Sequence, residues 1–242
     1  MIAAYKEGMY ELEVNNDVIY AVRKFNEAEL LYPQSDWAPR AALMAAYAYY
    51  AGNYYSDSIY ELEKFINTYP NHKNLDYAYF LLSMNHYQTI VDEKKDLKPI
   101  LEAKKNFIYL LKKYPNTDYA EDAKYKIDLL NNILAAKEVY IARHYMKKQK
   151  WIPAINRFKT VIEDYDTTIF AEEALHRLVE INYNIGLEGE AKKYAKLLGY
   201  NYQSSEWYKQ SYKILNKDYK IEKPNKLKDK KRLKNFVKRL FK

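Results

Sequence analysis

The 242-residue chain contains no cysteine, which excludes disulfide bonds, thiolate zinc sites and cysteine nucleophiles. It has only 5 glycines and 7 prolines, so its composition is neither collagen-like nor that of a low-complexity disordered chain. No run of about 18 apolar residues occurs, and no segment is therefore predicted to span a membrane. The first residues, MIAAYKEGMYELE, lack a basic region followed by an apolar core. We expect either a cytosolic protein or one whose leader has been removed.

Catalytic motifs are also missing. The sequence has no glycine-rich phosphate loop, no Gly-x-Ser-x-Gly and no His-Glu-x-x-His. The four histidines lie in different segments with no ligand spacing between them, and each is expected to be a surface or packing residue. They are His72, His86, His144 and His176. We therefore expect no enzymatic activity, no metal site and no cofactor.

The chain is rich in tyrosine, with 28 residues of this type, and several of them end a repeated pattern. From Tyr47 to Pro70, two helical patterns flank a break at Gly52-Asn53, and a Tyr-Pro pair ends the second. Apolar residues recur at three- and four-residue steps after the break, as on one face of a helix. Pro70 cannot continue a helix and disfavours helical geometry at Tyr69. This stretch predicts two helices joined by a short turn.

The pattern occurs five times in the same register. The residues that follow the recurring tyrosine are Pro33, Pro70, Pro115, Asp166 and Gln203. Twelve residues before them are small side chains, at Ala21, Ser58, Ala103, Ala154 and Ala191. Eight residues before them are Phe25, Leu62, Phe107, Phe158 and Ala195, and five before them are Ala28, Phe65, Leu110, Val161 and Leu198. Such a period is typical of a helical-hairpin repeat of about 34 residues with lengthened loops.

We therefore predict an all-α fold, an α-solenoid of five helical hairpins with further helices at the C-terminal end. A generic helical bundle is the alternative, but a bundle does not require the same residues in the same register five times. The predicted five-repeat domain covers 1–216. Its hairpins span about 3–33, 37–70, 76–115, 118–166 and 168–203, followed by a cap helix over 205–216.

Positive charge is concentrated at the C-terminal end. Residues 217–242 hold 12 Lys or Arg against 3 Asp or Glu, whereas the whole chain has a net charge of +8. This segment predicts a basic linker and an amphipathic helix that contacts a membrane or a partner; a disordered tail is the alternative, but the apolar stripe favours a contact. The residues assigned to that contact are Lys230, Lys231, Arg232, Phe236, Lys238, Arg239 and Phe241. A basic tail is also typical of nucleic-acid binding, but the repeats lack the positive charge that phosphates need, so no nucleic acid is expected.

A repeat array of this kind exposes a wall built from the first helix of each hairpin. Residues beside the small inward positions of these helices are predicted to line a groove for a peptide. They are Tyr10, Leu43, Tyr47, Tyr50, Phe80, Met84 and Tyr87. Tyrosine suits such a surface because it combines a large contact area with a polar tip. The alternative is that these tyrosines pack between the repeats.

Several stretches, in this order, resemble a known family. They are Tyr32-Pro-Gln-Ser-Asp-Trp37, Ala46-Tyr-Ala-Tyr-Tyr50, Phe65-Ile-Asn-Thr-Tyr-Pro70, Tyr114-Pro-Asn-Thr-Asp-Tyr-Ala120 and Ala154-Ile-Asn-Arg-Phe158. The hairpins look like tetratricopeptide repeats. Over about residues 3–215, the chain resembles the BamD family of outer-membrane protein assembly lipoproteins, and most of all its alphaproteobacterial members.

The resemblance implies a lipoprotein on the periplasmic face of the outer membrane, held at its inner leaflet by a lipid anchor. It implies that the N-terminal repeats bind the targeting signals of unfolded outer-membrane proteins. The C-terminal repeats would dock on the periplasmic domains of BamA, beside the other lipoproteins of the complex. Arg157 and Arg177 are the candidate contacts with that partner.

Two departures from the family pattern affect these expectations. The family carries a lipid-modified cysteine after a signal peptide, and this chain has no cysteine, so we expect that segment to have been removed. Proline is also replaced in two repeats, at Asp166 and Gln203. The alternative function is that of a generic cytosolic repeat adaptor that binds the peptide tail of a partner.

Overall fold

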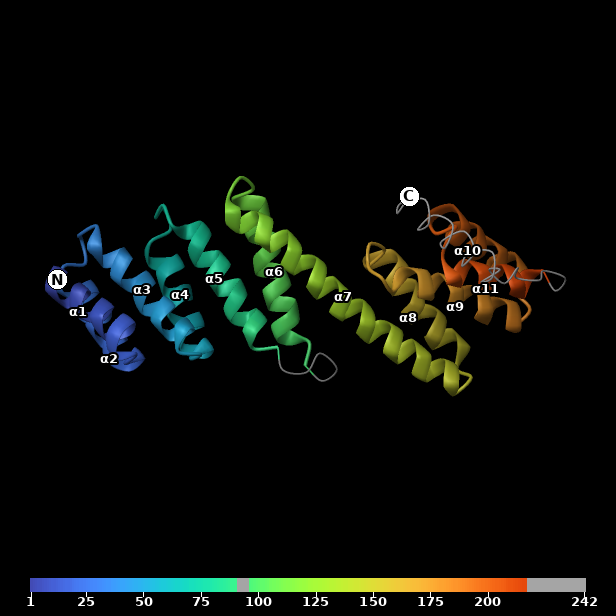
Figure 1. The fold of residues 1–242 in the computed structure, drawn as a ribbon, viewed down its shortest axis with the longest axis horizontal. Coiled ribbons are helices and arrows are strands. Elements are labelled where there is room, and N and C mark those ends of the chain that lie inside the picture. Colours follow the sequence, from blue (N-terminus) through green and yellow to red (C-terminus); the bar gives the residue numbers. More distant parts are fainter. Residues whose placement is uncertain (91–95, 217–242) are drawn as a thin grey trace, which may run out of the picture. The chain divides into compact units, whose positions relative to one another are not determined.

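The computed structural model describes residues 1–90 and 96–216, and these contain eleven α-helices, one π-helical turn and no strand (Figure 1). The all-α prediction is confirmed. The first six elements are α1 (Ile2–Tyr10), the π-helical turn η1 (Glu11–Asn15), α2 (Val18–Leu31), α3 (Trp37–Ala51), α4 (Tyr55–Thr68) and α5 (Leu75–Gln88). The others are α6 (Lys98–Lys113), α7 (Asp118–Lys147), α8 (Trp151–Asp164), α9 (Ala171–Asn184), α10 (Glu188–Asn201) and α11 (Glu206–Leu215).

The chain forms two compact units, and the boundary between Lys137 and Glu138 falls inside α7. In the first unit, each helix from α1 to α5 packs on the next one along the chain. In the second unit, α8 packs on α9, α9 on α10, and α11 on both α9 and α10. Contacts between sequence neighbours are the pattern expected of stacked helical hairpins. A single five-repeat domain over 1–216 remains a prediction.

The recurring tyrosine ends the second helix of every pair. It is the C-terminal cap of α2, α4, α6, α8 and α10, at Tyr32, Tyr69, Tyr114, Tyr165 and Tyr202. In four of them the tyrosine N–H donates to the carbonyl four residues earlier. The helices also end in the two repeats where Asp166 and Gln203 replace proline, so proline is not required to stop them. The predicted helix ends are therefore correct.

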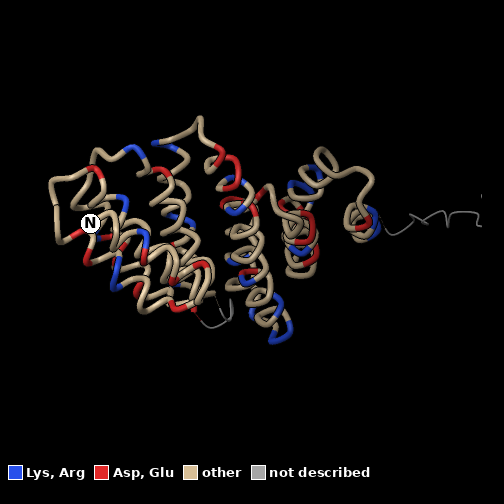
Figure 2. Tube along the Cα trace, turned by 60° about the vertical axis from the view of Figure 1, so that its left-hand side comes forward, with Lys and Arg blue, Asp and Glu red and all other residues tan. Residues whose placement is uncertain are grey.

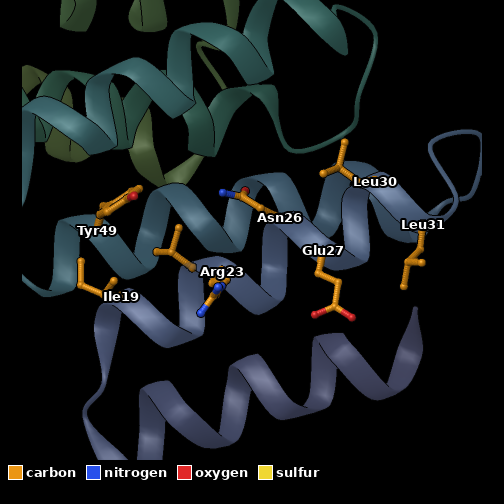
Figure 3. Close-up of a pocket in the computed structure, with 8 residues that line it drawn as sticks. Ile19, Arg23, Asn26, Glu27, Leu30, Leu31 and Tyr49 are labelled. Atoms are coloured by element: carbon orange, nitrogen blue, oxygen red, sulfur yellow. The ribbon is translucent and has the colours of Figure 1, made fainter.

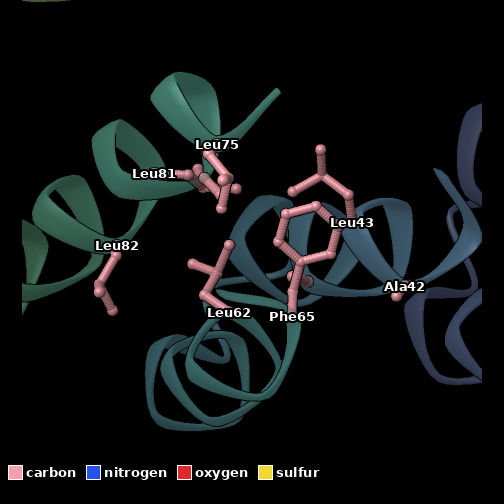
Figure 4. Packing of buried hydrophobic residues seen from close by; sticks show 9 residues of the cluster. Ala42, Leu43, Leu62, Phe65, Leu75, Leu81 and Leu82 are labelled. Carbon is pink, nitrogen blue, oxygen red and sulfur yellow. The ribbon is translucent and has the colours of Figure 1, made fainter. Parts of the chain in front are cut away.

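Most of the positions that recur in the sequence repeat lie in the buried core. All five small residues are fully buried, as are Phe25, Leu62, Phe107 and Phe158. The exception is Ala195 on α10, which is only half-buried because the following helix, α11, packs more on α9 than on α10. Figure 4 shows one such cluster, where Leu62 and Phe65 of α4 lie between residues of α3 and α5.

A buried polar contact joins three helices of the first unit at Ser58. Its hydroxyl donates to the carbonyl oxygen of Ala46 on α3 at 2.8 Å, and it accepts from Nδ2 of Asn85 on α5 at 2.9 Å. All three residues are fully buried. A small side chain is needed here because the backbone of α3 lies within hydrogen-bonding distance of α4. A buried hydroxyl with both partners present sets the position of the three helices along one another.

Candidate functional site

The predicted groove residues fall into three groups in the first unit. Tyr10 on α1 and Tyr47 on α3 are exposed, whereas Phe80, Met84 and Tyr87 on α5 are half-buried. Tyr50 is half-buried too, and it packs against the cluster formed by α3, α4 and α5. Tyr50 therefore fits the alternative in which some tyrosines contribute to packing between helices.

Leu43 is a correction to the predicted groove. Its side chain is only 5% exposed and belongs to the core cluster around Phe65 (Figure 4). Leu75 and Ala78, from the first turns of α5, belong to the same cluster. Leu43 lies one helical turn before Tyr47, in the middle of α3, and the first turns of α5 pack against it, so its apolar side chain is removed from water.

Two tyrosines that the sequence analysis missed join the groove residues into a row. Tyr77 of α5 and Tyr119 of α7 lie with ring centroids 5.6 Å apart, and Tyr119 lies 5.1 Å from Phe80. Burial raises the pKa of Tyr77 above its ordinary range, and the nearby hydroxyls of Tyr47, Tyr119 and Tyr50 raise it further. These rings, supplied by α3, α5 and α7, form what we call the tyrosine row: Tyr47, Tyr50, Tyr77, Phe80 and Tyr119.

A hollow of ≈ 410 Å³ lies beside the tyrosine row, and Tyr47 lines both. It is formed by α1, η1, the start of α2 and α3, and its other apolar side chains are Met9, Leu12, Val18, Met44 and Ala51. Methionine adapts its shape to irregular apolar groups more easily than branched residues do. Tyr87, the last of the predicted groove residues, lies on α5, and Lys126 Nζ lies 5.0 Å above its ring. The surface is therefore mainly aromatic and apolar, with the polar side chains of Glu13 and Asn16 at the hollow and a cation at Tyr87.

A larger hollow, of ≈ 730 Å³, follows α2. Figure 3 shows Leu30 and Leu31 at one end of it, and Ile19 with Tyr49 of α3 at the other. Leu30 is 78% exposed and Ile19 is 56% exposed. The sequence analysis did not identify this hollow, because only the buried stripe of α2 was considered there.

The family model described as YfiO, an outer membrane lipoprotein, matches residues 1–197 of this chain. The chain belongs to this family. The outer membrane protein assembly factor BamD of Caulobacter vibrioides is 42% identical over 196 residues, which are 81% of this chain and 64% of that protein. That of Rickettsia prowazekii is 39% identical over 211 residues, or 87% of this chain and 84% of that protein. The BamD of Neisseria gonorrhoeae is 32% identical over 189 residues, 74% of this chain and 70% of that protein.

These matches confirm the family resemblance, including its alphaproteobacterial character. The chain spans less than two thirds of the length of the Caulobacter protein. The residues that match the YfiO family model include the whole tyrosine row and the hollow beside it. The relatives are named as assembly factors and not as enzymes. Within residues 1–90 and 96–216, no helix combines the length and hydrophobicity that a membrane crossing requires.

In the second unit of this YfiO-family chain, both predicted partner-contact arginines are held by ion pairs. Arg157 Nη1 donates to both carboxylate oxygens of Glu138, at 3.2 and 3.0 Å. Arg177 pairs with Glu180 at 2.7 Å and lies over the ring of Trp207, 5.4 Å from its centroid. The assignment of these arginines to a partner interface remains a prediction. The predicted contact residues Lys230 to Phe241 lie outside the described residues.

One buried pair has the composition of a catalytic dyad. His176 Nδ1 lies 2.8 Å from the hydroxyl oxygen of Ser211, between α9 and α11. Ser211 is fully buried, His176 is 3% exposed and its ring packs against Trp207. Burial lowers the pKa of His176. No substrate reaches such a pair, so we interpret it as a packing contact. In the described part of the chain, no cluster of three or more His, Asp or Glu is arranged to hold a metal ion.

Stability in alkaline solution should depend on the half-buried Tyr69 of the first unit. The hydroxyl of Tyr69 donates to Glu29 at 3.1 Å; burial first, then the Glu29 carboxylate, raise the pKa of Tyr69 to about 12. A folded-state pKa above the unfolded value of about 10 means that the protonated tyrosine stabilises the fold below pH 10, and that this contribution is lost as pH rises through about 12. We expect the free energy of unfolding, measured in urea, to fall over this window.

The free energy of unfolding of the variant Tyr69→Phe should fall less steeply with pH than that of the parent chain, because the substitution removes the hydroxyl that titrates. Tyr60, which is 68% exposed on the same helix, supplies the control. The free energy of unfolding of Tyr60→Phe should change with pH as it does in the parent chain. Equal slopes for both variants would contradict the role assigned to Tyr69.

Proposed function

We propose that this chain is a non-enzymatic scaffold and substrate receptor in outer-membrane protein assembly. Its membership of the YfiO family supports a role in that process at the outer membrane. The observation that carries the receptor function is the tyrosine row with its adjacent hollow, an aromatic and apolar surface on the first unit. The ligand is the targeting signal of an unfolded barrel protein, an extended segment that ends in an aromatic residue.

The chemistry of the surface favours such a ligand. Strands of membrane β-barrels alternate apolar and polar side chains and carry aromatic residues at the membrane interfaces. Tyrosine rings and methionines accept aromatic and branched side chains without requiring one fixed shape. The described residues offer no strand edge to which a peptide could add, so recognition uses side chains and not a backbone ladder.

Charge supports the same conclusion. Lysines, arginines and carboxylates are interspersed along the helices of each unit (Figure 2). A ligand held mainly by aromatic and apolar contacts should bind with little dependence on salt. Binding to a nucleic acid would instead weaken steeply as salt rises.

We further propose that the second unit, with Arg157 and Arg177, docks on the periplasmic domains of BamA. Both arginines pair with glutamates, and the Arg157 side chain is 45% exposed. A partner carboxylate that competes for such a guanidinium forms a charge-assisted hydrogen bond. In this arrangement a lipid anchor holds the protein at the periplasmic face of the outer membrane, beside the other lipoproteins of the assembly complex.

Removing two rings of the surface should weaken substrate binding. The variant carries Tyr47→Ala and Tyr87→Ala, and the ligand is a labelled peptide with the C-terminal strand of a barrel protein. We expect a Kd at least about tenfold higher, because buried aromatic contacts are worth about 1–2 kcal/mol or more each. Fluorescence anisotropy measures the Kd, and photocrosslinking to the peptide should fall in parallel.

The matched control replaces two exposed tyrosines of the same unit, with Tyr32→Ala and Tyr60→Ala. This variant should bind the peptide like the parent chain. Circular dichroism should show the same helical content in all three proteins. If the peptide binds the first variant as tightly as the control, the tyrosine row is not the receptor surface.

A further inference from the structure

The helix α2 of the first unit carries apolar side chains that its own fold leaves uncovered. It packs on α1 and on α3, and the hollow of ≈ 730 Å³ described above runs along it. We call this hollow the α2 groove. Leu30 and Leu31 at one end of the groove, and Ile19 at the other, are all at least half exposed (Figure 3). Three large exposed apolar residues on one helix are typical of a surface that another molecule covers.

Two polar side chains in the middle of the α2 groove have unused bonding capacity. Oδ1 of Asn26 is buried and accepts no hydrogen bond within the described part of the chain. A buried acceptor without a donor costs free energy. The Arg23 guanidinium is exposed and forms no ion pair with residues 1–90 or 96–216. A partner that satisfies both groups must offer an N–H donor and a carboxylate.

The same helix carries the groups that such a partner needs. Glu27 lies one turn after Arg23 on the same flank of α2 and also lines the groove. Its side chain is 48% exposed and pairs with Lys24 at 3.2 Å, which leaves lone pairs of the carboxylate for a second cation. The amide of Asn26 contains both an N–H donor and an oxygen acceptor. Two copies of α2 can therefore complete one another.

A two-fold axis that crosses α2 near Asn26 would join all these groups at once. In an antiparallel pair of identical helices, residues at about equal distances on either side of the axis meet, and each flank stays on its own side. Arg23 then faces Glu27 of the second copy, and the two Asn26 amides meet at the axis. A half-turn of the amide about χ2 brings Oδ1 to the open side of the groove, where Nδ2 of the other Asn26 donates to it.

The two ends of the groove fit the same arrangement. Antiparallel pairing lays the leucine end of one copy on the other end of the second copy, which Ile19 and Tyr49 line (Figure 3). Leu30 is the most exposed of these side chains and enters the second copy's hollow beside Tyr49. A protruding leucine packed into such a hollow is the usual contact between paired helices.

We propose that the chain forms a two-fold symmetric dimer through the α2 groove, with α2 of one copy antiparallel to α2 of the other. Apolar contacts at both ends hold the helices together. Two Arg23–Glu27 ion pairs and the pair of Asn26 amides fix their register, as a buried asparagine pair does in other helix pairs. The interface uses mainly one helix from each copy, so it is small, and we expect a Kd on the order of 10 µM.

Charge exchange tests the proposed symmetry in the full chain, with the Kd of the dimer measured by sedimentation equilibrium. Arg23→Glu should raise the Kd at least about tenfold, because each copy then sets a carboxylate against Glu27 of the other. Arg23→Glu with Glu27→Arg should restore the Kd to within about threefold of the parent, since the same pairs form in reverse. The matched control Lys73→Glu, an exposed residue outside the groove, should leave the Kd unchanged.

The absence of cysteine allows a second test of the axis. Asn26→Cys places one thiol of each copy at the axis, where facing helices approach closely enough for a disulfide. Mild oxidation should convert most of this variant to a covalent dimer. Tyr60→Cys, on the exposed side of α4, should stay mainly monomeric under the same conditions. Circular dichroism of each variant checks that the helices remain folded.

Three results would overturn the proposal. One is a parent chain that remains monomeric at about thirty times the expected Kd. The others are a charge-exchanged variant as weak as Arg23→Glu, and equal crosslinking of the two cysteine variants. If the chain is monomeric and Leu30→Glu weakens binding of the barrel-strand peptide, the groove is a ligand surface instead. The variant with Tyr47→Ala and Tyr87→Ala should dimerise like the parent, so this test is separate from that of the receptor function.

Discussion

Replacing Phe65 by alanine should lower the free energy of unfolding of the first unit by about 3–5 kcal/mol. Phe65 is fully buried at the centre of the cluster formed by α3, α4 and α5 (Figure 4). Its ring also lies 5.5 Å from the rings of Tyr69 and His72. Alanine would leave a cavity that helices held on both sides cannot close. Hydrogen exchange of the α3, α4 and α5 amides measures the loss of stability in the first unit separately from the second.

Tyr60 supplies the matched control because it lies on the same helix and is 68% exposed. Tyr60→Ala should change the free energy of unfolding by no more than about 0.5 kcal/mol. Amides of α8 to α10 should exchange at their original rates in both variants. A loss of similar size for the two variants would show that Phe65 does not occupy a closed core.

Replacing Glu173 by alanine should destabilise the second unit by about 2 kcal/mol. The Glu173 carboxylate is nearly buried and pairs with two arginines. Arg143 Nε donates to it at 2.7 Å, and Arg177 Nε lies 3.6 Å away. Its removal leaves two guanidinium groups without this partner, but Arg143 is 50% exposed, so water offsets part of the loss. Urea unfolding followed by Trp207 fluorescence measures the change.

Two further variants separate the ion pair from general damage to α9. Glu188→Ala breaks a pair in which both side chains are 61% exposed, and should cost less than about 0.5 kcal/mol. Glu173→Leu with Arg143→Met replaces the buried carboxylate and its half-exposed arginine partner by apolar groups, and should recover part of the stability lost in Glu173→Ala. If the single and double variants are equally unstable, the loss comes from packing and not from the unpaired charge.

The repeat register was predictable because it depends on local spacing. A small residue twelve positions before the end of each second helix predicted a close helix contact, and all five of these residues are fully buried. The tyrosines at the helix ends were also predicted, from the same comparison of the repeats with one another. The fifth repeat shows the limit of this reasoning. Ala195 shares the register of Phe25 but is only half-buried, because no further hairpin in the described residues covers α10.

The candidate site was predictable only in part. Leu43 and Tyr47 lie one helical turn apart on the same face of α3, yet Leu43 is in the core and Tyr47 is exposed. What separates them is the start of α5, about thirty residues later in the sequence. Tyr119 was missed for a similar reason, since it begins a different helix and meets Phe80 only after folding. No helical periodicity contains this information.

The sequence alone determined the all-helical repeat pattern, the ends of the second helices and most residues of the buried stripes. These features follow from the 3.6-residue period and from the recurring tyrosine in a fixed register, both of which act within one helix. Only the tertiary structure decided which tyrosines line a surface, how Glu173 joins two arginines and where a groove stays open along α2. Each of these depends on side chains from helices far apart in the sequence, and exposure to water is decided where such helices meet.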